Sequence, residues 1–366
     1  MSAQKRLLRV AASAVILCAA LGLLPAGHAS ALDLSEGIMR LTLHQGIGRF
    51  SLACVKDPGG APIPLLAAQD PRTTTLSIVV GTKIYRMGES GDFSEAVQKT
   101  PLGGRFVWTS SFLSVTEDFS FVASPGSATA DGVRIDITVR NASKENLKAG
   151  LRYLFDTYLG ESGLVPFSTD RQPTIKRETT LAGKDLPAWW LSPLAGDAGP
   201  FGLQIMASAP GVTPPDRIVF ANWKRLSDAA WSYDTSAARD FSLKPYSLND
   251  SAVCQYYDPR ALVPGGQFSA TLVMGRFNPS GFSANAASLK ASSNFASAVQ
   301  QSLDAGKAAR SAPAAIRSDI EALNAILARV DAALAAGGGA TDDELALMES
   351  AITDLKARLA AYGSGK

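Results

Sequence analysis

The chain has 366 residues and a formal net charge of +2, with 35 basic residues against 33 acidic ones. Residues 1–31 contain three of the basic residues and no acidic one, so the remainder is near neutral, with a formal charge of −1. A near-neutral chain lacks the basic face that nucleic-acid binding requires. His44 is the one histidine beyond residue 31, which excludes a zinc site built on several histidines. We expect no metal and no cofactor.

The first 31 residues have the pattern of a secretory signal peptide. Three basic side chains at 5–9 precede an apolar run at 10–24, and Ala29-Ser30-Ala31 provides the small residues of a cleavage site. The apolar run is shorter than the roughly 20 residues of a transmembrane helix. We therefore expect a mature chain that begins near Leu32, is periplasmic or secreted, and has no membrane span after cleavage.

Residues 32–280 are predicted to form a β-sandwich domain. Apolar and polar residues alternate along several segments, as they do in strands with one buried face, and turns rich in Gly, Pro and Asn separate the segments. The expected strands include 39–44, 76–80, 112–122, 133–140, 151–155, 201–206, 252–257 and 268–277. The segment 217–233 is left open between strand and partial helix. The pattern indicates a mainly β protein with a large antiparallel two-sheet sandwich.

Residues 281–366 are rich in alanine and are predicted to be helical, with a weakly amphipathic helix at 284–309 and a helical hairpin at 313–362. Apolar residues recur at spacings of three and four in both arms, and the glycines at 337–339 separate the arms. One interpretation is that the two arms pack on each other and on the sandwich. The other is that the second arm binds an envelope protein or another copy of the chain. Its candidate contact residues are Leu345, Met348, Ile352, Leu355 and Leu359.

Two cysteines, Cys54 and Cys254, remain after the signal peptide. In an oxidising compartment an even pair is compatible with a disulfide. Two buried thiols that never meet are equally compatible with the sequence, so both interpretations stay open.

Two acidic residues near the end of a predicted strand are candidate ligand-binding residues. Asp156 follows the strand at 151–155, and Glu161 comes five residues later, after a glycine. Such carboxylates can form a general acid–base pair or bind calcium. Alternatively, Asp156 shapes the turn and Arg152 balances its charge.

Aromatic residues provide a second set of candidates. Trp189, Trp190 and Trp223 can stack on sugar rings, because an indole is flat, apolar and has a polar edge. In a sandwich, such residues more often belong to the core. Trp189 and Trp190 are adjacent, so they would face opposite sides of a strand.

Several motifs carry a family resemblance. The segment 151–161, followed by Val165-Pro166-Phe167, is similar to a DT-x-x-G…PF segment of exported bacterial β-sandwich proteins. Asn249-Asp250-Ser251, with the segments 262–266 and 274–277, is similar to the closing part of the same group. These proteins resemble the galactose-mutarotase-like supersandwich, and the resemblance spans roughly residues 40–278. It implies a supersandwich fold. It does not imply mutarotase activity, because that family uses catalytic histidines that have no match here.

Two functions are compatible with these observations. The first is an exported, non-enzymatic binding or assembly protein of the cell envelope, with partner contacts through the C-terminal helices. The alternative is a carbohydrate-binding or carbohydrate-active protein. No residue is assigned a catalytic role.

Overall fold

The computed structural model describes residues 31–364 except for 58–59, 68–69, 126, 128, 164, 195, 197–200, 285–298, 301–302, 305–311 and 336–341. The chain divides into two compact units. The sandwich unit comprises residues 29–99 and 103–287, and the helical unit is built mainly from residues 288–366. The predicted signal peptide lies outside the described residues, apart from Ala31.

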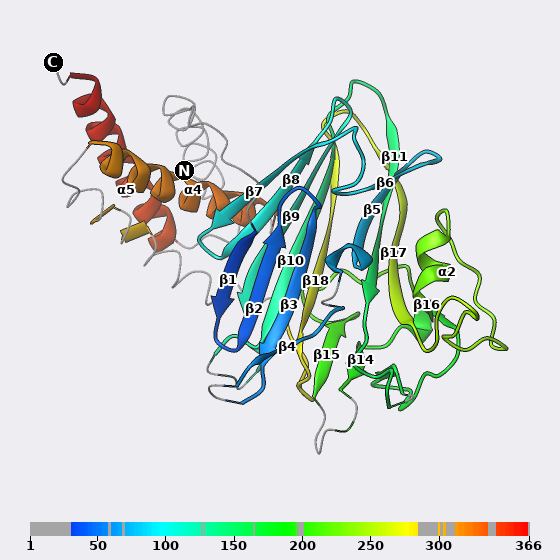
Figure 1. The fold of residues 1–366 in the computed structure, drawn as a ribbon. Coiled ribbons are helices and arrows are strands. Elements are labelled where there is room, and N and C mark those ends of the chain that lie inside the picture. Colours follow the sequence, from blue (N-terminus) through cyan, green and yellow to red (C-terminus); the bar gives the residue numbers. More distant parts are fainter. Residues whose placement is uncertain are drawn as a thin grey trace. The chain divides into compact units, whose positions relative to one another are not determined.

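The sandwich unit contains one sheet of eight strands, in the order β12-β14-β15-β18-β10-β9-β8-β7 (Figure 1). Its strands are β7 (Ser94–Thr100), β8 (Gly103–Thr109), β9 (Leu113–Val122), β10 (Gly132–Asn141), β12 (Ser168–Thr169), β14 (Trp189–Pro193), β15 (Gly202–Met206) and β18 (Gln267–Arg276). In β10 every second residue is buried, as the sequence predicts. Val133, Ile135, Ile137 and Val139 are fully buried, because successive side chains of a strand point to opposite faces.

A second sheet has six strands, in the order β13-β16-β17-β11-β5-β6. Its strands are β5 (Thr75–Val80), β6 (Lys83–Arg86), β11 (Leu147–Asp156), β13 (Thr179–Ala182), β16 (Arg217–Asn222) and β17 (Ser251–Leu262). Neighbouring strands of this sheet pair antiparallel. A four-stranded sheet, β1-β2-β3-β4, completes the unit. It contains β1 (Leu32–Glu36), β2 (Met39–His44), β3 (Arg49–Val55) and β4 (Pro62–Pro64).

One large apolar cluster joins the three sheets. Tyr153 and Phe155 of β11 stack at 4.5 Å between ring centroids, and Phe50 of β3 contacts Tyr153 edge-on. This inner cluster packs on one face of the six-stranded sheet. A separate cluster packs on the opposite face, which we call the outer face. Leu154, Cys254 and Tyr256 belong to that second cluster. The antiparallel sandwich predicted from the sequence is confirmed.

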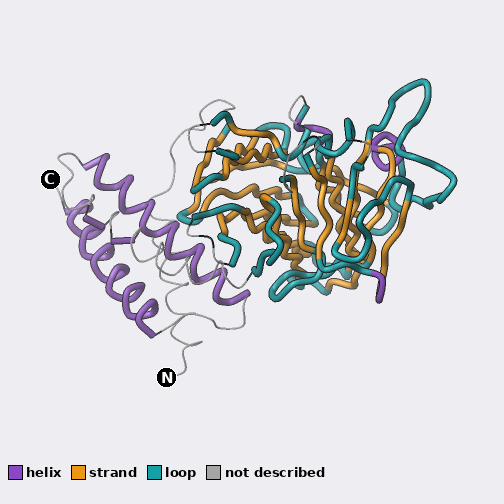
Figure 2. The backbone as a smooth tube through the Cα atoms, turned by 90° about the horizontal axis from the view of Figure 1, so that it is seen from below, coloured by secondary structure: helices purple, strands orange, loops and turns teal. Residues whose placement is uncertain are grey.

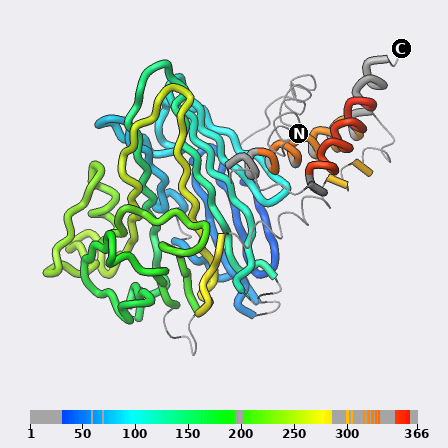
Figure 3. Tube along the Cα trace, turned by 180° about the vertical axis from the view of Figure 1, so that it is seen from behind, coloured from blue at the N-terminus to red at the C-terminus, as the bar shows by residue number. Residues whose placement is uncertain are grey.

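The chain between β16 and β17 covers part of the outer face. It begins with the short helix α2 (Trp223–Asp228), whose Leu226 is fully buried in the outer cluster. In Figure 3 this connection, in yellow-green, forms loops at one side of the sandwich unit. The segment 217–233, which the sequence left open, is therefore a strand, a six-residue helix and a loop. Two 3₁₀ turns, η1 (Pro71–Thr73) and η2 (Gly183–Asp185), lie in other connections.

The helical unit contains two long helices, α4 (Ala312–Ala335) and α5 (Asp342–Ser364), which lie side by side in Figure 2. Leu323, Ile326 and Val330 of α4 pack with apolar residues of α5 and with Val299 and Leu303. The predicted helical arms are confirmed. The glycine turn at 337–339 and most of the helix expected at 284–309 fall outside the described residues. Among the helices that the structure describes, none is long and apolar enough to cross a membrane.

Candidate functional site

The two acids singled out from the sequence lie where the end of β11 meets the start of β17. Asp156 is the last residue of β11 and pairs with Ala252, the second residue of β17. After β11 the chain turns back toward β17. There Glu161 Oε1 accepts hydrogen bonds from Ser251 N at 2.8 Å and from Ser251 Oγ at 3.1 Å. The return requires Gly160, because a Cβ there would collide with the backbone of Val165 and Pro166.

Asp156 is held in a largely buried position. Its side chain is 8% exposed, and burial raises the pKa of its carboxyl to about 6, although a side-chain hydrogen bond with Thr73 opposes that shift. The backbone around it is also fixed, since Asp156 N donates to Thr74 Oγ1 at 3.1 Å and its carbonyl accepts from Ala67 N at 3.1 Å. Asp156 therefore has a constrained position and retains its proton to a higher pH than an exposed aspartate.

Glu161 and Asp250 add two more carboxyl groups to this end of the sheet. Burial raises the pKa of Glu161 to about 7, the two hydrogen bonds from Ser251 oppose the shift, and the charges of Asp156 and Asp250 add to it. Burial also raises the pKa of Asp250, against hydrogen bonds from Ser247 and Asn222. Near neutral pH the group therefore contains both protonated and ionised carboxyls, which interact electrostatically.

Trp223 joins this group from helix α2. Its Nε1 donates to Thr73 O at 2.9 Å, which places it beside the residue that hydrogen-bonds Asp156. Asn222 caps the helix, because its Oδ1 accepts from Arg225 N at 3.3 Å. The Nδ2 of Asn222 donates to Asp250 O at 3.0 Å and so ties the helix start to the start of β17. We call Asp156, Glu161, Asp250 and Trp223 the carboxylate site.

The other two tryptophan candidates lie elsewhere. Trp190 is fully buried in the core and contacts Phe155, Phe167 and Phe220, so neither of its faces is free to stack on a sugar. Trp189 is partly buried and meets Phe277 edge-on at 5.5 Å between ring centroids. Of the three candidates, only Trp223 belongs to the carboxylate site.

The cysteines and His44 have structural environments. Cys54 and Cys254 are both free and buried, in the inner and outer clusters respectively. Burial raises the pKa of each thiol to about 11, so both stay protonated and weakly nucleophilic at neutral pH. The structure thus agrees with the second of the two interpretations. His44 forms a hydrogen bond between Nε2 and Ser51 Oγ at 2.8 Å on the neighbouring strand.

The helical residues proposed for partner binding are largely internal to their own unit. Leu345, Met348, Ile352 and Leu355 are at most 5% exposed and belong to the cluster between the helices. The side chain of Leu359 lies outside the described residues. The stripe of α5 is thus used to close the helical unit, and a role in partner binding stays a prediction.

Sequence reasoning did not identify Thr73, Asn222 and Asp250 as parts of the site. Asp250 stood with Ser251 in the motif that carried the family resemblance, which was the one signal that pointed toward Asp250; no sequence signal pointed toward Thr73 or Asn222. Among the described residues, no three His, Cys, Asp or Glu side chains are arranged to hold a metal ion.

No protein-family model and no curated protein matches the chain. Among solved structures, it is similar to a galactose mutarotase-like protein from Lactobacillus casei, with 13% identity, a TM-score of 0.35, and 68% of this chain and 100% of that one covered. It is also similar to a galactose mutarotase related enzyme from Lactobacillus acidophilus, with 12% identity, a TM-score of 0.34, and coverage of 68% and 98%. A polysaccharide lyase matches with 9% identity and a TM-score of 0.36 over 74% of this chain, which spans only 35% of the lyase. The chain is thus distantly similar to galactose mutarotase-like proteins.

Proposed function

We propose that the protein is exported and that its sandwich unit binds a carbohydrate at the carboxylate site. The observation that carries the proposal is the convergence of Asp156, Glu161 and Asp250 beside Trp223. The signal-peptide pattern of residues 1–31 motivates the proposed export, and recovery of the mature chain in the periplasmic or culture fraction tests it.

The chemistry of the carboxylate site suits a ligand with many hydroxyl groups. An ionised carboxylate accepts hydrogen bonds, whereas a protonated carboxyl can also donate one. Since the pKa values of Asp156 and Glu161 are about 6 and 7, both forms are present near neutral pH. A sugar hydroxyl is both donor and acceptor and can pair with either form. The apolar face of a sugar ring can pack against the partly buried indole of Trp223.

A binding screen on the full mature chain tests the proposal. We expect neutral oligosaccharides on a glycan array or in a thermal-shift panel to give a response that falls in Asp156→Asn and in Glu161→Gln. Asp131→Asn is a matched control, because Asp131 has the same 8% exposure and lies outside the carboxylate site. A wild type that responds to no glycan, or a response that both site variants retain, contradicts the proposal.

The two raised pKa values also favour a second candidate function, general acid–base chemistry on the bound sugar. A general acid or base works best when its pKa is near the operating pH. In that case turnover of the ligand found in the screen should depend on pH with apparent pKa values near 6 and 7. Binding without turnover at any pH leaves carbohydrate binding alone.

A further inference from the structure

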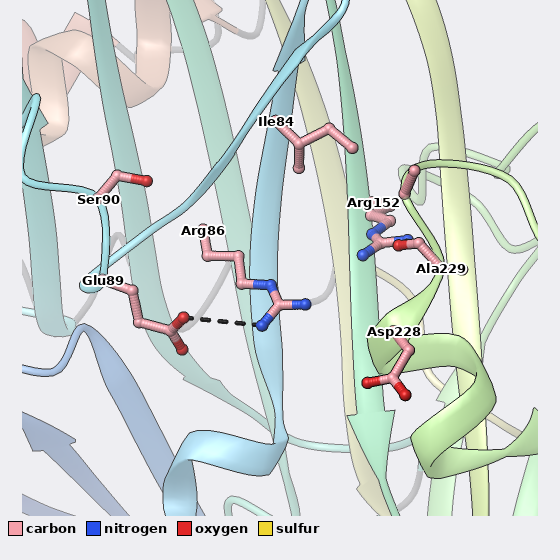
Figure 4. A pocket seen from close by; sticks show the side chains of 8 residues that line it. Ile84, Arg86, Glu89, Ser90, Arg152, Asp228 and Ala229 are labelled. Atoms are coloured by element: carbon pink, nitrogen blue, oxygen red, sulfur yellow. Dashed lines mark hydrogen bonds and ion pairs between the residues drawn. The ribbon is translucent and has the colours of Figure 1, made fainter.

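A second feature of the outer face is a cavity of ≈ 380 Å³ near the edge strand β6. Residues of β6, β11, the turn after β6 and the end of α2 line it, among them Ile84, Arg86, Glu89, Ser90, Arg152 and Asp228 (Figure 4). All of them belong to the sandwich unit. The volume is within the range typical of small-molecule sites. We call this feature the arginine cavity.

Strand register places the two arginines in one row across the sheet. Arg86 of β6 pairs with Ser77 of β5, and Ser77 pairs with Arg152 of β11. Directly paired residues point to the same face, and neighbouring strands lie 4.7–4.9 Å apart, so the two arginine backbones are separated by about 10 Å. The small Ser77 between them leaves space that a longer side chain would fill.

Both guanidinium groups are anchored but keep donors for a ligand. Arg86 Nη2 donates to Ser227 O at 2.5 Å, and Arg152 Nη1 donates to Ala229 O and Trp231 O at 3.2 and 3.0 Å. These bonds hold the end of α2 and the loop after it over the sheet. A guanidinium has five N–H donors, so each arginine has donors beyond these bonds.

Of the two arginines, Arg152 has the less well compensated charge. It is only 2% exposed, and its Nε has no hydrogen-bond partner. Its guanidinium lies 5.9 Å from the centroid of the Trp231 ring, and among the described residues it forms no ion pair with a carboxylate. By contrast, Arg217 in the same row is paired with Asp258 at 2.6 Å. Burying a charge without a counter-charge is unfavourable. An anion in the cavity would relieve that penalty.

The two carboxylates that line the cavity are already paired. Glu89 is paired with the buried Arg49 at 2.5 Å and with Arg86 at 3.8 Å, and Asp228 is paired with Lys224 at 2.8 Å. Of the two arginines and two carboxylates in the lining, Arg152 is the one charge without an ion pair among the described residues. An anion can pair with Arg152 without displacing an existing ion pair, and the cavity walls weaken the screening by water.

We propose that the arginine cavity binds the carboxylate group of a small molecule of monosaccharide size, through Arg86 and Arg152. A flat carboxylate matches the planar fork of a guanidinium. A tetrahedral phosphate would instead bring additional charged oxygens toward Glu89 and Asp228. Ile84 and Ala229 provide apolar wall for the rest of the ligand. This inference does not depend on carbohydrate binding at the carboxylate site, which involves different residues.

The test compares three probes on the full mature chain by calorimetry: D-glucuronate, D-glucose and D-glucose 6-phosphate. We expect glucuronate to bind at least about tenfold more tightly than glucose, since a charge-assisted hydrogen bond contributes about that much. Lactate, a carboxylate without a sugar ring, separates a sugar acid from a simple organic acid. Lactate binding as tight as that of glucuronate would identify a simple acid as ligand and would keep the carboxylate assignment.

Two variants make the cavity less positive in different ways. Arg86→Gln removes one guanidinium, and Ser90→Glu adds a negative charge to the cavity lining. Each should reduce the preference for glucuronate over glucose by about tenfold. Arg260→Gln is the matched control, because Arg260 is similarly exposed and has one long ion pair, 3.9 Å to Asp216. It should change glucuronate binding by less than about twofold.

The outcomes distinguish this inference from the proposed function. Asp156→Asn should leave glucuronate binding intact, and Arg86→Gln should leave any glucose response intact. The inference is overturned if glucuronate does not bind more tightly than glucose, or if glucose 6-phosphate binds more tightly than glucuronate. It is also overturned if the glucuronate preference survives in either cavity variant, once the melting temperature shows that the variant is folded.

Discussion

Strand β11 carries Arg152 and Asp156 on the same face, yet the two ends of that face have opposite electrostatic character. At one end, Arg86 and Arg152 line a cavity, and Arg152 forms no ion pair with any described residue. At the other end, Asp156, Glu161 and Asp250 place three carboxyls together. The apolar Leu154 lies between them and packs in the outer cluster with Leu226 of α2. A single strand can thus carry two oppositely charged sets of side chains when an apolar residue separates them.

Helix α2 is tied to both ends. Trp223 at its start donates to Thr73 O beside the carboxylate site, and Ser227 near its end accepts from Arg86 of the arginine cavity. The sheet and this short helix therefore position both sets of residues. Loosening the helix should therefore affect both ends, whereas a substitution at one end should leave the other end unchanged.

The largest effect is expected from Leu226→Ala. Leu226 is fully buried, and removing a buried leucine side chain typically destabilises a protein by about 2–5 kcal/mol. The free energy of unfolding, measured in urea, should fall by that amount, and ligand binding should weaken at both ends. Leu248→Ala, at a side chain that is 68% exposed, should change it by less than about 0.5 kcal/mol. A small loss of stability with both binding responses intact would show that α2 is not a shared anchor.

The next effect is the pH dependence of stability at the carboxylate end. The pKa values of Asp156 and Glu161 are raised to about 6 and 7 in the folded protein, so the folded state retains protons that the unfolded chain has released. Their contribution is full below about pH 4 and is lost as the pH rises through 7. For the buried Asp156 the contribution is about 1–3 kcal/mol.

Unfolding measured between pH 4 and 8 tests this expectation. The slope of stability against pH should be smaller in Asp156→Asn than in the wild type, and the variant should be at least as stable as the wild type at pH 8. Arg86→Gln, at the other end, should keep the wild-type slope between these limits. A slope that is unchanged in Asp156→Asn would contradict the raised pKa of that carboxyl.

The sequence predicted where the strands lie along the chain better than it predicted which strands lie side by side. Alternation along 133–140 was enough to identify β10, because one face of that strand is buried and the other is not. The carboxyl pair was also predictable, since a short turn keeps Asp156 and Glu161 close. Asp250 lies about 90 residues farther along the chain, and only the pairing of β11 with β17 brings it there.

The arginine cavity was not predictable from the sequence. Arg86, Ser77 and Arg152 form a row only because β6, β5 and β11 are neighbours in a particular register. Periodicity within a strand reports which face a residue occupies, not which strand lies beside it. For the same reason, Trp190 and Trp223 were equal candidates in the sequence, although one is in the core and the other is on α2.

Ionic strength should affect ligand affinity differently at the arginine cavity and at the carboxylate site. Raising salt from about 0.01 M to about 1 M shortens the Debye length from ~30 Å to ~3 Å, which weakens attraction between the partly open cavity and an anion. The glucuronate affinity should fall by about tenfold or more over this range, measured by calorimetry. A neutral glycan at the carboxylate site should keep its affinity within about threefold, since no charge is brought together. Equal salt dependence for both ligands would mean that they bind at one site.

The smallest effect is expected from Lys224→Ala, which changes the charge near the cavity without touching its lining. Lys224 Nζ lies 2.8 Å from Asp228, and both side chains are exposed, so the pair contributes little to stability. Without the lysine, the charge of Asp228 is less balanced and repels a bound carboxylate more strongly. Glucuronate should bind up to about twofold more weakly, while neutral glycan binding stays unchanged. Tighter glucuronate binding in this variant would contradict the expectation, because removing a cation can strengthen anion binding only if the lysine obstructs the ligand.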